Sequence, residues 1–396
     1  MNKAVAITGM GIISAIGNDT GENYRSLILG KHGISSPEIL KTIHRDLPVG
    51  EIKISNETLA QDLNLPKNHS FTRAALLGAF AVSEAITQSK LKIDGGTGFI
   101  SGTSVGGMDA TETYFKEFTE GKAENSRFIR AQHPGFTTEI IAEHFGITGF
   151  VSTISTACSS GANAIMLGAR MIKAGKLKRV IVGGTDCLTK FTLNGFNSLM
   201  ILSDEHCKPF DENRNGLNLG EGAAYLVLEA EEELNVKPVL GRISGYGNAN
   251  DAFHQTASSE NGEGAFLAMQ KAMKTAGISS EKIDYINAHG TATKNNDSAE
   301  AKALKRIFFK NSPDFSSTKA FTGHTLAAAG ALEAVYSLLS IQHQEVFANL
   351  NFSDPMDSSG FIPVTQLKAK PIDHVLSNSF GFGGNCTSLI FSKNGE

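Results

Sequence analysis

The chain has 396 residues, a net charge of −4, 41 glycines and only four cysteines, and it is long enough to bury a large core as one to three domains. It has no basic block that would indicate nucleic acid binding, and no apolar run of about 18 residues that would predict a membrane span. The cysteines are scattered without metal-ligand spacing, so we expect no disulfide framework, no metal site and a reducing cytoplasm.

Strand-like runs alternate with helical ones along the chain, which favours an α/β layered fold. In the first half we expect strands at 4–7, 97–103, 151–156, 179–184 and 223–229, and helices at 23–29, 57–63, 71–86, 110–118, 137–145 and directly after Cys158. Residues 8–11 are expected to form the turn after the first strand. In the second half we expect strands at 239–246, 285–288 and 387–391, and helices at 264–276, 298–308 and 326–344. Lys237-Pro238 is the expected boundary, which gives two halves, 1–238 and 239–396.

Cys158 lies between a short β-prone run and a helix that is apolar on almost every face. A helix of this kind is buried in the middle of a protein, and Gly161 within it indicates the close approach of another backbone. The start of a helix favours the negatively charged thiolate of a cysteine. The sequence therefore predicts that Cys158 is a nucleophile, whereas Cys187, Cys207 and Cys386 are expected only to pack.

Three further segments carry side chains suited to acyl chemistry. His289 follows a predicted strand, and His324 begins a second helix of small residues, five positions after Lys319. Residues 378–385 form a glycine-rich segment with two aromatic side chains, which we expect to be a loop that offers a backbone N–H to a ligand. A thiolate, two imidazoles and a cation support acyl transfer through a thioester on Cys158. A decarboxylation fits the additional imidazole, because an enolate oxygen then needs hydrogen-bond donors.

Several short motifs in a fixed order give the chain a more specific likeness. They are residues 5–11, 156–161, 208–211, 220–222 and 380–384, together with the segments around His289 and His324. Over essentially its whole length the chain resembles the elongating, type II β-ketoacyl-acyl-carrier-protein synthases of the thiolase superfamily. The resemblance implies a thiolase-like, five-layered αβαβα fold with duplicated halves. The first half would carry the nucleophilic cysteine and the second half the two catalytic histidines.

The resemblance also implies an activity and its partners. The protein would be an acyltransferase of fatty acid biosynthesis and lipid metabolism that condenses malonyl carrier protein with an acyl group on Cys158, with loss of carbon dioxide. It would act as a cytoplasmic homodimer without a cofactor of its own, because the phosphopantetheine arm belongs to the acyl carrier protein. Neither nucleic acid nor a membrane is expected as a partner. Because the carrier protein is acidic, we expect a local basic docking patch. The candidates for this patch are Lys67, Arg73, Arg127, Arg130 and Lys208.

The family's catalytic residues correspond to five positions of this sequence. Cys158 would hold the acyl chain, while His289 and His324 would assist decarboxylation and stabilise the enolate. Lys319 would tune or hold the region of His324. The backbone N–H groups of Cys158 and Phe382 would form the oxyanion hole, in which the loss of one donor typically lowers the rate by about 10²–10³.

Other positions are expected to contact the substrate or to support the site. Thr291 and Thr293 would hydrogen-bond the phosphopantetheine arm, and Phe382 would gate the acyl channel. The remaining expected substrate contacts are Phe380, Phe196 and Val105. The supporting acidic residues are Asp297, Glu300 and Glu333, for which a helix cap or a salt bridge is as good an interpretation as a direct catalytic role.

Three departures from the family pattern concern packing and substrate choice. Ala327 stands where the family usually has glycine, which should tighten packing. Asn385-Cys386 replaces a pair whose second residue is commonly Asn, which puts a structural or cation contact there in question. The loop from 196 to 208 is shorter than in typical fatty-acid enzymes, as it is in synthases of aryl-polyene and flexirubin pigment clusters. The alternative function is therefore that of a ketosynthase in such a pathway, or in another polyketide pathway.

Two further classes of protein fit the sequence less well. A thiolase uses one histidine with a second cysteine as base, and the pair of His289 and His324 with Lys319 argues against that class. A chain-length-factor-like subunit, which only shapes a heterodimer, lacks the nucleophile, and Cys158 is present.

Overall fold

The computed structural model describes residues 5–122, 124–234, 237–309, 312–356 and 362–395. The strands of the N-terminal half are β1 (Val5–Ser14), β4 (Thr97–Gly102), β5 (Val151–Ile154), β6 (Arg179–Asp186) and β7 (Gly222–Ala230). Those of the C-terminal half are β8 (Gly241–Asn250), β9 (Tyr285–Asn287), β10 (Asp314–Ser316), β13 (His374–Phe380) and β14 (Asn385–Ser392). Two small hairpins pair β2 (Ile34–Ser35) with β3 (Val49–Gly50), and β11 (Glu345–Val346) with β12 (Lys368–Ala369).

The α-helices connect these strands. They are α1 (Thr20–Ile28), α2 (Asn56–Asp62), α3 (Arg73–Ser89), α4 (Met108–Thr119), α5 (Pro134–His144), α6 (Ser160–Lys173), α7 (Lys190–Ser198), α8 (Glu263–Ala276), α9 (Lys294–Ile307), α10 (Lys319–Thr322) and α11 (Ala329–His343). Within the described ranges, no helix is long and apolar enough to cross a membrane.

The two halves of the chain repeat one strand topology. In the N-terminal half, β1 is antiparallel to β7 and β7 to β6, and then β4 and β5 follow in parallel. In the C-terminal half, β8, β14, β13, β9 and β10 show the same order and the same directions. A short antiparallel pairing of β1 with β8, at Ala6–Arg242 and Ile7–Gly241, joins the halves into one ten-stranded sheet of the described residues.

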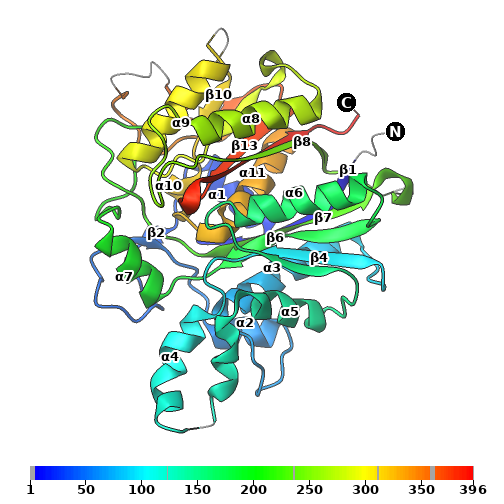
Figure 1. Ribbon diagram of the computed structural model, residues 1–396, viewed down its shortest axis with the longest axis vertical. Helices are drawn as coiled ribbons and strands as arrows, with labels where there is room; N and C mark the ends of the chain where they lie inside the picture. The colour runs from blue at the N-terminus through cyan, green and yellow to red at the C-terminus, as the bar shows by residue number, and fades with distance from the viewer. Residues whose placement is uncertain (1–4, 123, 235–236, 310–311, 357–361, 396) are drawn as a thin grey trace.

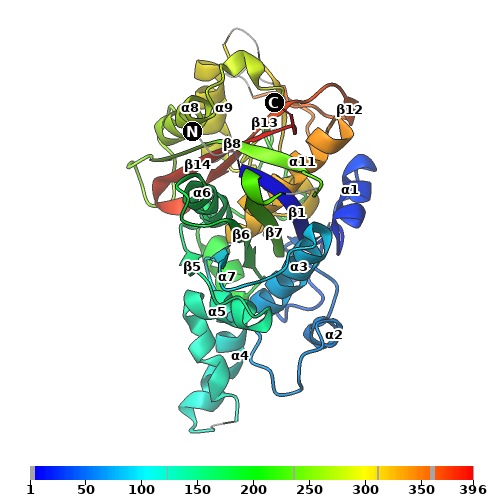
Figure 2. The ribbon, with the colours of Figure 1, turned by 90° about the vertical axis from the view of Figure 1, so that its right-hand side faces the viewer.

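The helices form three layers: one lies between the two half-sheets, and one covers the outer face of each half-sheet (Figures 1 and 2). The buried helices α6 and α11 lie between the half-sheets, and each contacts strands of both. Helices α3 and α5 cover the outer face of the N-terminal half, and α8 and α9 cover that of the C-terminal half. The result is the five-layered αβαβα arrangement of a thiolase-like fold.

The two central helices meet through glycines at their N-terminal ends. A Cβ atom on Gly161 of α6 would lie 2.8 Å from the carbonyl oxygen of Ala327, and one on Gly330 of α11 would lie 2.9 Å from a side-chain carbon of α6. Only glycine permits this approach of the two backbones. Since Cys158 precedes α6 and His324 precedes α11, the helix contact brings the two residues to one place.

The start of the chain differs from the sequence-based expectation. The predicted turn at 8–11 is part of β1, which runs on to Ser14, while Ala4 lies outside the described residues. The glycines serve packing rather than a turn. A Cβ atom on Gly9 would lie 2.4 Å, and one on Gly11 2.1 Å, from backbone oxygens of α3.

Several elements were not predicted, and two of them, β13 and α7, contribute to the site. Asn378, Ser379 and Phe380 belong to β13, so only the residues after them form the glycine turn. Helix α7 is capped by Thr189, whose side chain accepts from the backbone N–H of Thr192 in a capping box. Such a cap satisfies backbone N–H groups at the start of a short helix.

Candidate active site

Cys158 lies in a tight turn between β5 and α6. Ala157 before it has a φ of 52°, a left-handed conformation that is rare for residues other than glycine. The hydroxyl of Ser160 accepts from the backbone N–H of Thr156 at 2.9 Å and donates to the carbonyl of Ala157 at 2.6 Å. These bonds hold the turn, and Cys158 lines a cavity of about 460 Å³.

Burial dominates the protonation of the Cys158 thiol. It raises the pKa of the thiol to about 11, although the charge of Lys319 and a hydrogen bond from the backbone N–H of Phe382 lower it. The nearby carboxyl of Asp186 raises the pKa further. Burial therefore opposes the thiolate that the helix start favours, because the charged form loses its hydration. The thiol loses its proton only as it reacts.

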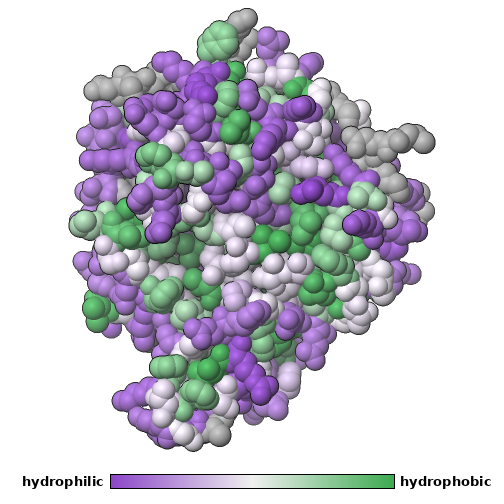
Figure 3. Space-filling model, viewed as in Figure 1, coloured by the Kyte–Doolittle hydropathy of each residue, from purple (hydrophilic) through white to green (hydrophobic). Residues whose placement is uncertain are grey.

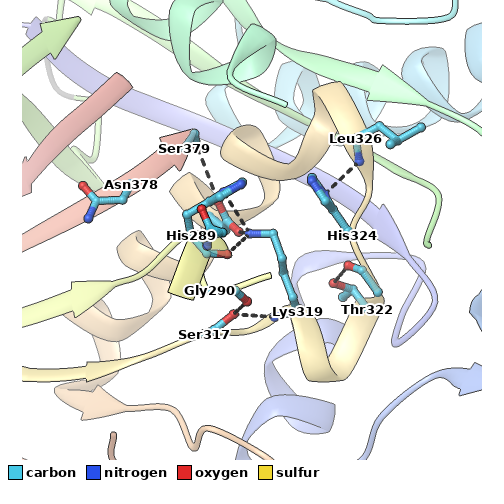
Figure 4. Close-up of polar contacts among 12 residues, drawn as sticks. His289, Gly290, Ser317, Lys319, Thr322, His324, Leu326, Asn378 and Ser379 are labelled. Carbon is cyan, nitrogen blue, oxygen red and sulfur yellow. Dashed lines mark hydrogen bonds and ion pairs between the residues drawn. The ribbon is translucent and has the colours of Figure 1, made fainter. Parts of the chain in front are cut away.

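His289 and His324 lie side by side in the same cavity, with ring centroids 5.5 Å apart and planes at 85°. The N–H of Leu326 donates to Nδ1 of His324 at 3.3 Å, and the Lys319 ammonium lies 3.4 Å from Nδ1 of His289 (Figure 4). Because Nδ1 accepts in each ring, the proton of each neutral imidazole is on Nε2. The site therefore has two Nε2–H donors.

Both imidazoles are neutral at physiological pH. Burial, the charge of Lys319 and the ring of His324 hold the pKa of His289 well below 6.5. Burial and Lys319 hold the pKa of His324 well below 6.5 as well. Neutral rings can donate from Nε2 without adding a positive charge to the site.

Lys319 and Glu333 form a buried ion pair beside His289. The Lys319 ammonium also donates to the carbonyl oxygen of His289 at 2.5 Å, and the hydroxyl of Ser379 donates to Glu333 at 3.4 Å (Figure 4). Burial raises the pKa of Glu333 to about 7, although Lys319 opposes that rise. The resemblance associated Lys319 with the region of His324, whereas its direct contacts are with His289.

Two acidic residues hold the segment of His289 from behind. Glu300 accepts from the backbone N–H groups of His289 and Gly290 at 3.0 and 2.9 Å, and Asp297 accepts from that of Ala292 at 3.2 Å. Burial raises the pKa of Asp297, and it raises that of Glu300 to about 7. Neither side chain lines the cavity, so their geometry is that of supporting residues.

Aromatic and hydroxyl side chains form the walls of the cavity. The rings of Phe196 and Phe382 stack at 5.7 Å with planes at 13°, and Phe380 lies 5.5 Å from the ring of His289. The hydroxyl oxygens of Thr291 and Thr293 are 2.9 Å apart, in the segment of the cavity wall that leads into α9. The space-filling view shows a recess in this face beside α7 (Figure 3).

Asp186 is a buried residue of the site that the sequence did not reveal. It accepts from the hydroxyl of Thr103 at 2.6 Å and from the N–H of Ala327 at 3.0 Å, and burial raises its pKa to about 6. It thereby ties the end of β4 to the turn after His324. Val105, an expected substrate contact, does not line the cavity, and its N–H lies 3.4 Å from Asp186. In the sequence, the only indication of this role is that Asp186 is an acidic residue at the end of a strand.

The departure at Asn385-Cys386 places an amide and a thiol near the nucleophile. The side-chain oxygen of Asn385 accepts from Ser159 at 2.8 Å, Asn163 at 2.8 Å and Asn248 at 2.9 Å. This network joins the start of α6 to β8 and β14. Cys386 lines the cavity together with Cys158. In the described part of the chain, no group of three or more His, Cys, Asp or Glu side chains could hold a metal ion.

Comparison with known families decides the relationship. The model of the beta-ketoacyl synthase N-terminal domain matches residues 2–233, and that of the beta-ketoacyl synthase C-terminal domain matches residues 240–353. The chain belongs to the beta-ketoacyl synthase family. It is 33% identical over 411 residues to 3-oxoacyl-[acyl-carrier-protein] synthase 2 of Staphylococcus aureus strain N315, and 31% identical over 414 residues to the protein of the same name from Vibrio cholerae. Both alignments cover 99% of each chain.

Solved structures of ketosynthases share the whole fold. The ishigamide ketosynthase/chain length factor superimposes with a TM-score of 0.94 and 26% identity, covering 100% of both chains. A ketosynthase in complex with its chain length factor from Xenorhabdus doucetiae gives a TM-score of 0.84 and 32% identity over 99% of this chain and 98% of the other. The matches therefore span both halves of the molecule.

Proposed function

We propose that this beta-ketoacyl synthase is a 3-oxoacyl-[acyl-carrier-protein] synthase of fatty acid elongation, which joins a malonyl unit to an acyl group on Cys158. One observation carries the proposal: a buried thiol, two neutral imidazoles with Nε2–H donors and the backbone N–H of Phe382 meet at one cavity. The relatives with this name match the chain from end to end.

The first step is a thioester exchange. The sulfur of Cys158 attacks the carbonyl carbon of the acyl-carrier thioester, a new C–S bond forms, and the bond to the phosphopantetheine sulfur breaks. The proton of the Cys158 thiol ends on the departing carrier thiol. With a pKa of about 11, the thiol must lose its proton during the attack, and the backbone N–H groups of Cys158 and Phe382 stabilise the oxyanion that forms.

The second step is decarboxylation of the malonyl thioester. The bond between the central carbon of the malonyl unit and its free carboxylate breaks, and carbon dioxide leaves. The electron pair of that bond stays on the thioester fragment and forms the enolate. The Nε2–H groups of His289 and His324 donate to the enolate oxygen, as two preorganised donors. The neutral state of both rings leaves these donors in place.

The third step makes the new carbon–carbon bond. The enolate carbon attacks the carbonyl of the acyl-Cys158 thioester, the tetrahedral oxyanion collapses, and the Cys158 sulfur leaves and takes up one proton. The product is the β-ketoacyl carrier protein. Phe382 gates the acyl channel with Phe196 stacked on it, and Thr291 and Thr293 hydrogen-bond the incoming arm.

The assembly and location of the enzyme belong to the same proposal. We propose a cytoplasmic homodimer that needs no cofactor of its own, because the arm arrives on the carrier protein. Size-exclusion chromatography with light scattering tests the dimer, and condensation in metal-chelated buffer without additives tests the cofactor.

A second candidate function is that of a ketosynthase in an aryl-polyene, flexirubin-type or other polyketide pathway. It is favoured by the short loop from 196 to 208, and by the 32% identity to a ketosynthase that forms a complex with a chain length factor. The reaction steps would be the same, and the acyl chain would differ.

The test is a condensation assay with malonyl carrier protein and carrier proteins that bear saturated or conjugated polyunsaturated chains. Mass spectrometry of the carrier follows the β-ketoacyl product. Elongation of saturated chains supports fatty acid elongation, whereas elongation of conjugated chains alone supports the second candidate. Release of carbon dioxide without any elongated product would contradict both.

A further inference from the structure

A short glycine-rich turn between β13 and β14 brings the backbone N–H of Phe382 to the sulfur of Cys158. The turn is closed by a hydrogen bond from the N–H of Gly381 to the carbonyl oxygen of Asn385, at 2.8 Å. Within it, Gly383 has a φ of 81°. Because glycine adopts many backbone conformations, the turn alone does not fix the direction of the Phe382 N–H.

The first end of this turn packs on the turn of the nucleophile. A Cβ atom on Gly381 would lie 2.6 Å from the carbonyl oxygen of Thr156 and 3.3 Å from the backbone nitrogen of Cys158. Only glycine permits this approach. The contact sets the closest distance between the two turns. An attractive interaction is still needed to hold them at that distance.

The side chain of Asn385, at the other end of the turn, supplies this attraction. Its oxygen lies 2.8 Å from the hydroxyl of Ser159, the residue after Cys158, and 2.8 Å from the amide nitrogen of Asn163 in α6. The hydroxyl of Ser159 also lies 2.7 Å from the carbonyl oxygen of Thr156, and it has a single proton to donate. The amide of Asn163 is therefore the more constant donor to Asn385.

The surroundings of this oxygen suit an acceptor and nothing else. The amide nitrogen of Asn248 on β8 lies 2.9 Å from it, as a third donor. The oxygen of Asn163 is itself occupied, because it accepts from Asn248 at 3.1 Å and from the hydroxyl of Thr387 at 2.8 Å. A flipped amide or an apolar side chain at position 385 would leave these donors without a partner. The network thus fixes the orientation of Asn385.

We propose that Asn385 is a positioning residue of the oxyanion hole. Its side-chain oxygen holds the turn of Phe382 against the start of α6, and so sets the separation between the backbone N–H groups of Phe382 and Cys158. An oxyanion is stabilised only when both donors are within hydrogen-bond distance of it at once. Asn385 does not line the cavity, so it acts through Phe382. The proposal rests on the proposed function.

The experiment compares two reactions of Cys158. The first is acylation from an acyl pantetheine thioester, which passes through an oxyanion. The second is alkylation by iodoacetamide, in which the sulfur displaces iodide and no oxyanion forms. Mass spectrometry follows both products at Cys158. A change in the pKa or the accessibility of the thiol alters both rates, so the ratio of acylation to alkylation reports on the oxyanion hole.

Three substitutions of Asn385 separate the acceptor from the shape of the side chain. Asn385→Leu removes the acceptor with little change in size, and Asn385→Asp, the matched control, keeps an oxygen acceptor in the same shape. Asn385→Ala leaves room for water at this half-buried position, and it replaces the leucine variant if that protein does not fold. A fourth variant, Asn163→Leu, removes the link from the side of α6.

We expect the ratio of acylation to alkylation to fall about tenfold or more in Asn385→Leu and Asn385→Ala, and to stay within about threefold of the wild type in Asn385→Asp. Asn163→Leu should lower the ratio as well, and the double variant Asn163→Leu/Asn385→Leu should lose little more than either single variant.

An equal fall in the two rates of Asn385→Leu would show a general loss of structure and overturn the proposal. A fall in the ratio of Asn385→Asp as large as that of Asn385→Leu would overturn it as well, because the acceptor is then irrelevant. A wild type that is alkylated at Cys158 but acylated by no thioester would instead overturn the proposed function.

Discussion

The ammonium of Lys319 lies 2.5 Å from the carbonyl oxygen of His289 and 3.4 Å from Nδ1 of the same residue. One cation thus fixes the backbone, the tautomer and the charge state of the ring. We expect Lys319→Met to raise the pKa of His289, because its charge helps to hold that pKa well below 6.5. The acid limb of decarboxylation, which lies below pH 6.5 in the wild type, should move to higher pH. A pH–rate profile of carbon dioxide release measures it, and an unmoved limb would contradict the role.

The two histidines should be dispensable for acylation and essential for condensation. We expect His289→Ala and His324→Ala each to keep the thioester exchange on Cys158 and to lose about 10²–10³ in the rate of condensation, since each removes one donor to the enolate. Intact mass measures acylation, and product mass measures condensation. Loss of acylation with normal carbon dioxide release would reverse this assignment.

The buried carboxyl of Asp186 should make stability depend on pH. Burial raises its pKa to about 6 from 3.8, so between these values the folded protein binds a proton that the unfolded chain does not. The stabilisation is complete below pH 3.8 and is lost as pH rises toward 6. Over this window the free energy of unfolding of Asp186→Asn, which cannot ionise, should rise by about 3 kcal/mol relative to the wild type. Urea unfolding between pH 4 and 7 measures it, and a constant difference would refute it.

The contact of the central helices at Gly161 should tolerate no side chain. A Cβ atom there would lie 2.8 Å from a backbone oxygen and 3.1 Å from the Cβ of Ala331. We expect Gly161→Ala to cost about 1–3 kcal/mol and to slow acylation, because the turn of Cys158 must shift. Gly195→Ala is the matched control. Its Cβ atom meets nothing within 4 Å in helix α7, so stability should be unchanged or slightly higher. Thermal unfolding compares the two variants.

The sequence predicted the chemistry better than the surroundings of the site. Cys158, His289 and His324 stand at recognisable strand and helix boundaries, and the structure places all three at one cavity. The rise in the pKa of the Cys158 thiol was not predicted, because burial depends on the whole fold rather than on one helix start. Arg73, which is buried, was assigned to the surface, since its partner Glu221 is far along the chain and no local pattern joins them.

The layered arrangement of the fold was predicted from the sequence, whereas the bounds of its strands were predicted less well. Helices such as 71–86 were recognisable from small and apolar residues, and α3 covers nearly that range. The glycines of 8–11 and 381–384 have similar local sequences, yet the first group continues β1 and the second forms a turn. The difference is set by what packs on them, because α3 lies against Gly9 and Gly11.

The most direct test of the account is the intact mass of the purified protein after mixing with acyl carrier protein that bears a saturated chain. We expect the wild type to gain the mass of one acyl group. The variant Cys386→Ala, which removes the other cysteine of the same cavity, should gain it as well. Cys158→Ala should fold normally and gain nothing. Acylation of Cys158→Ala, or its absence in the wild type with every acyl chain supplied, would contradict the assignment of Cys158 as the nucleophile.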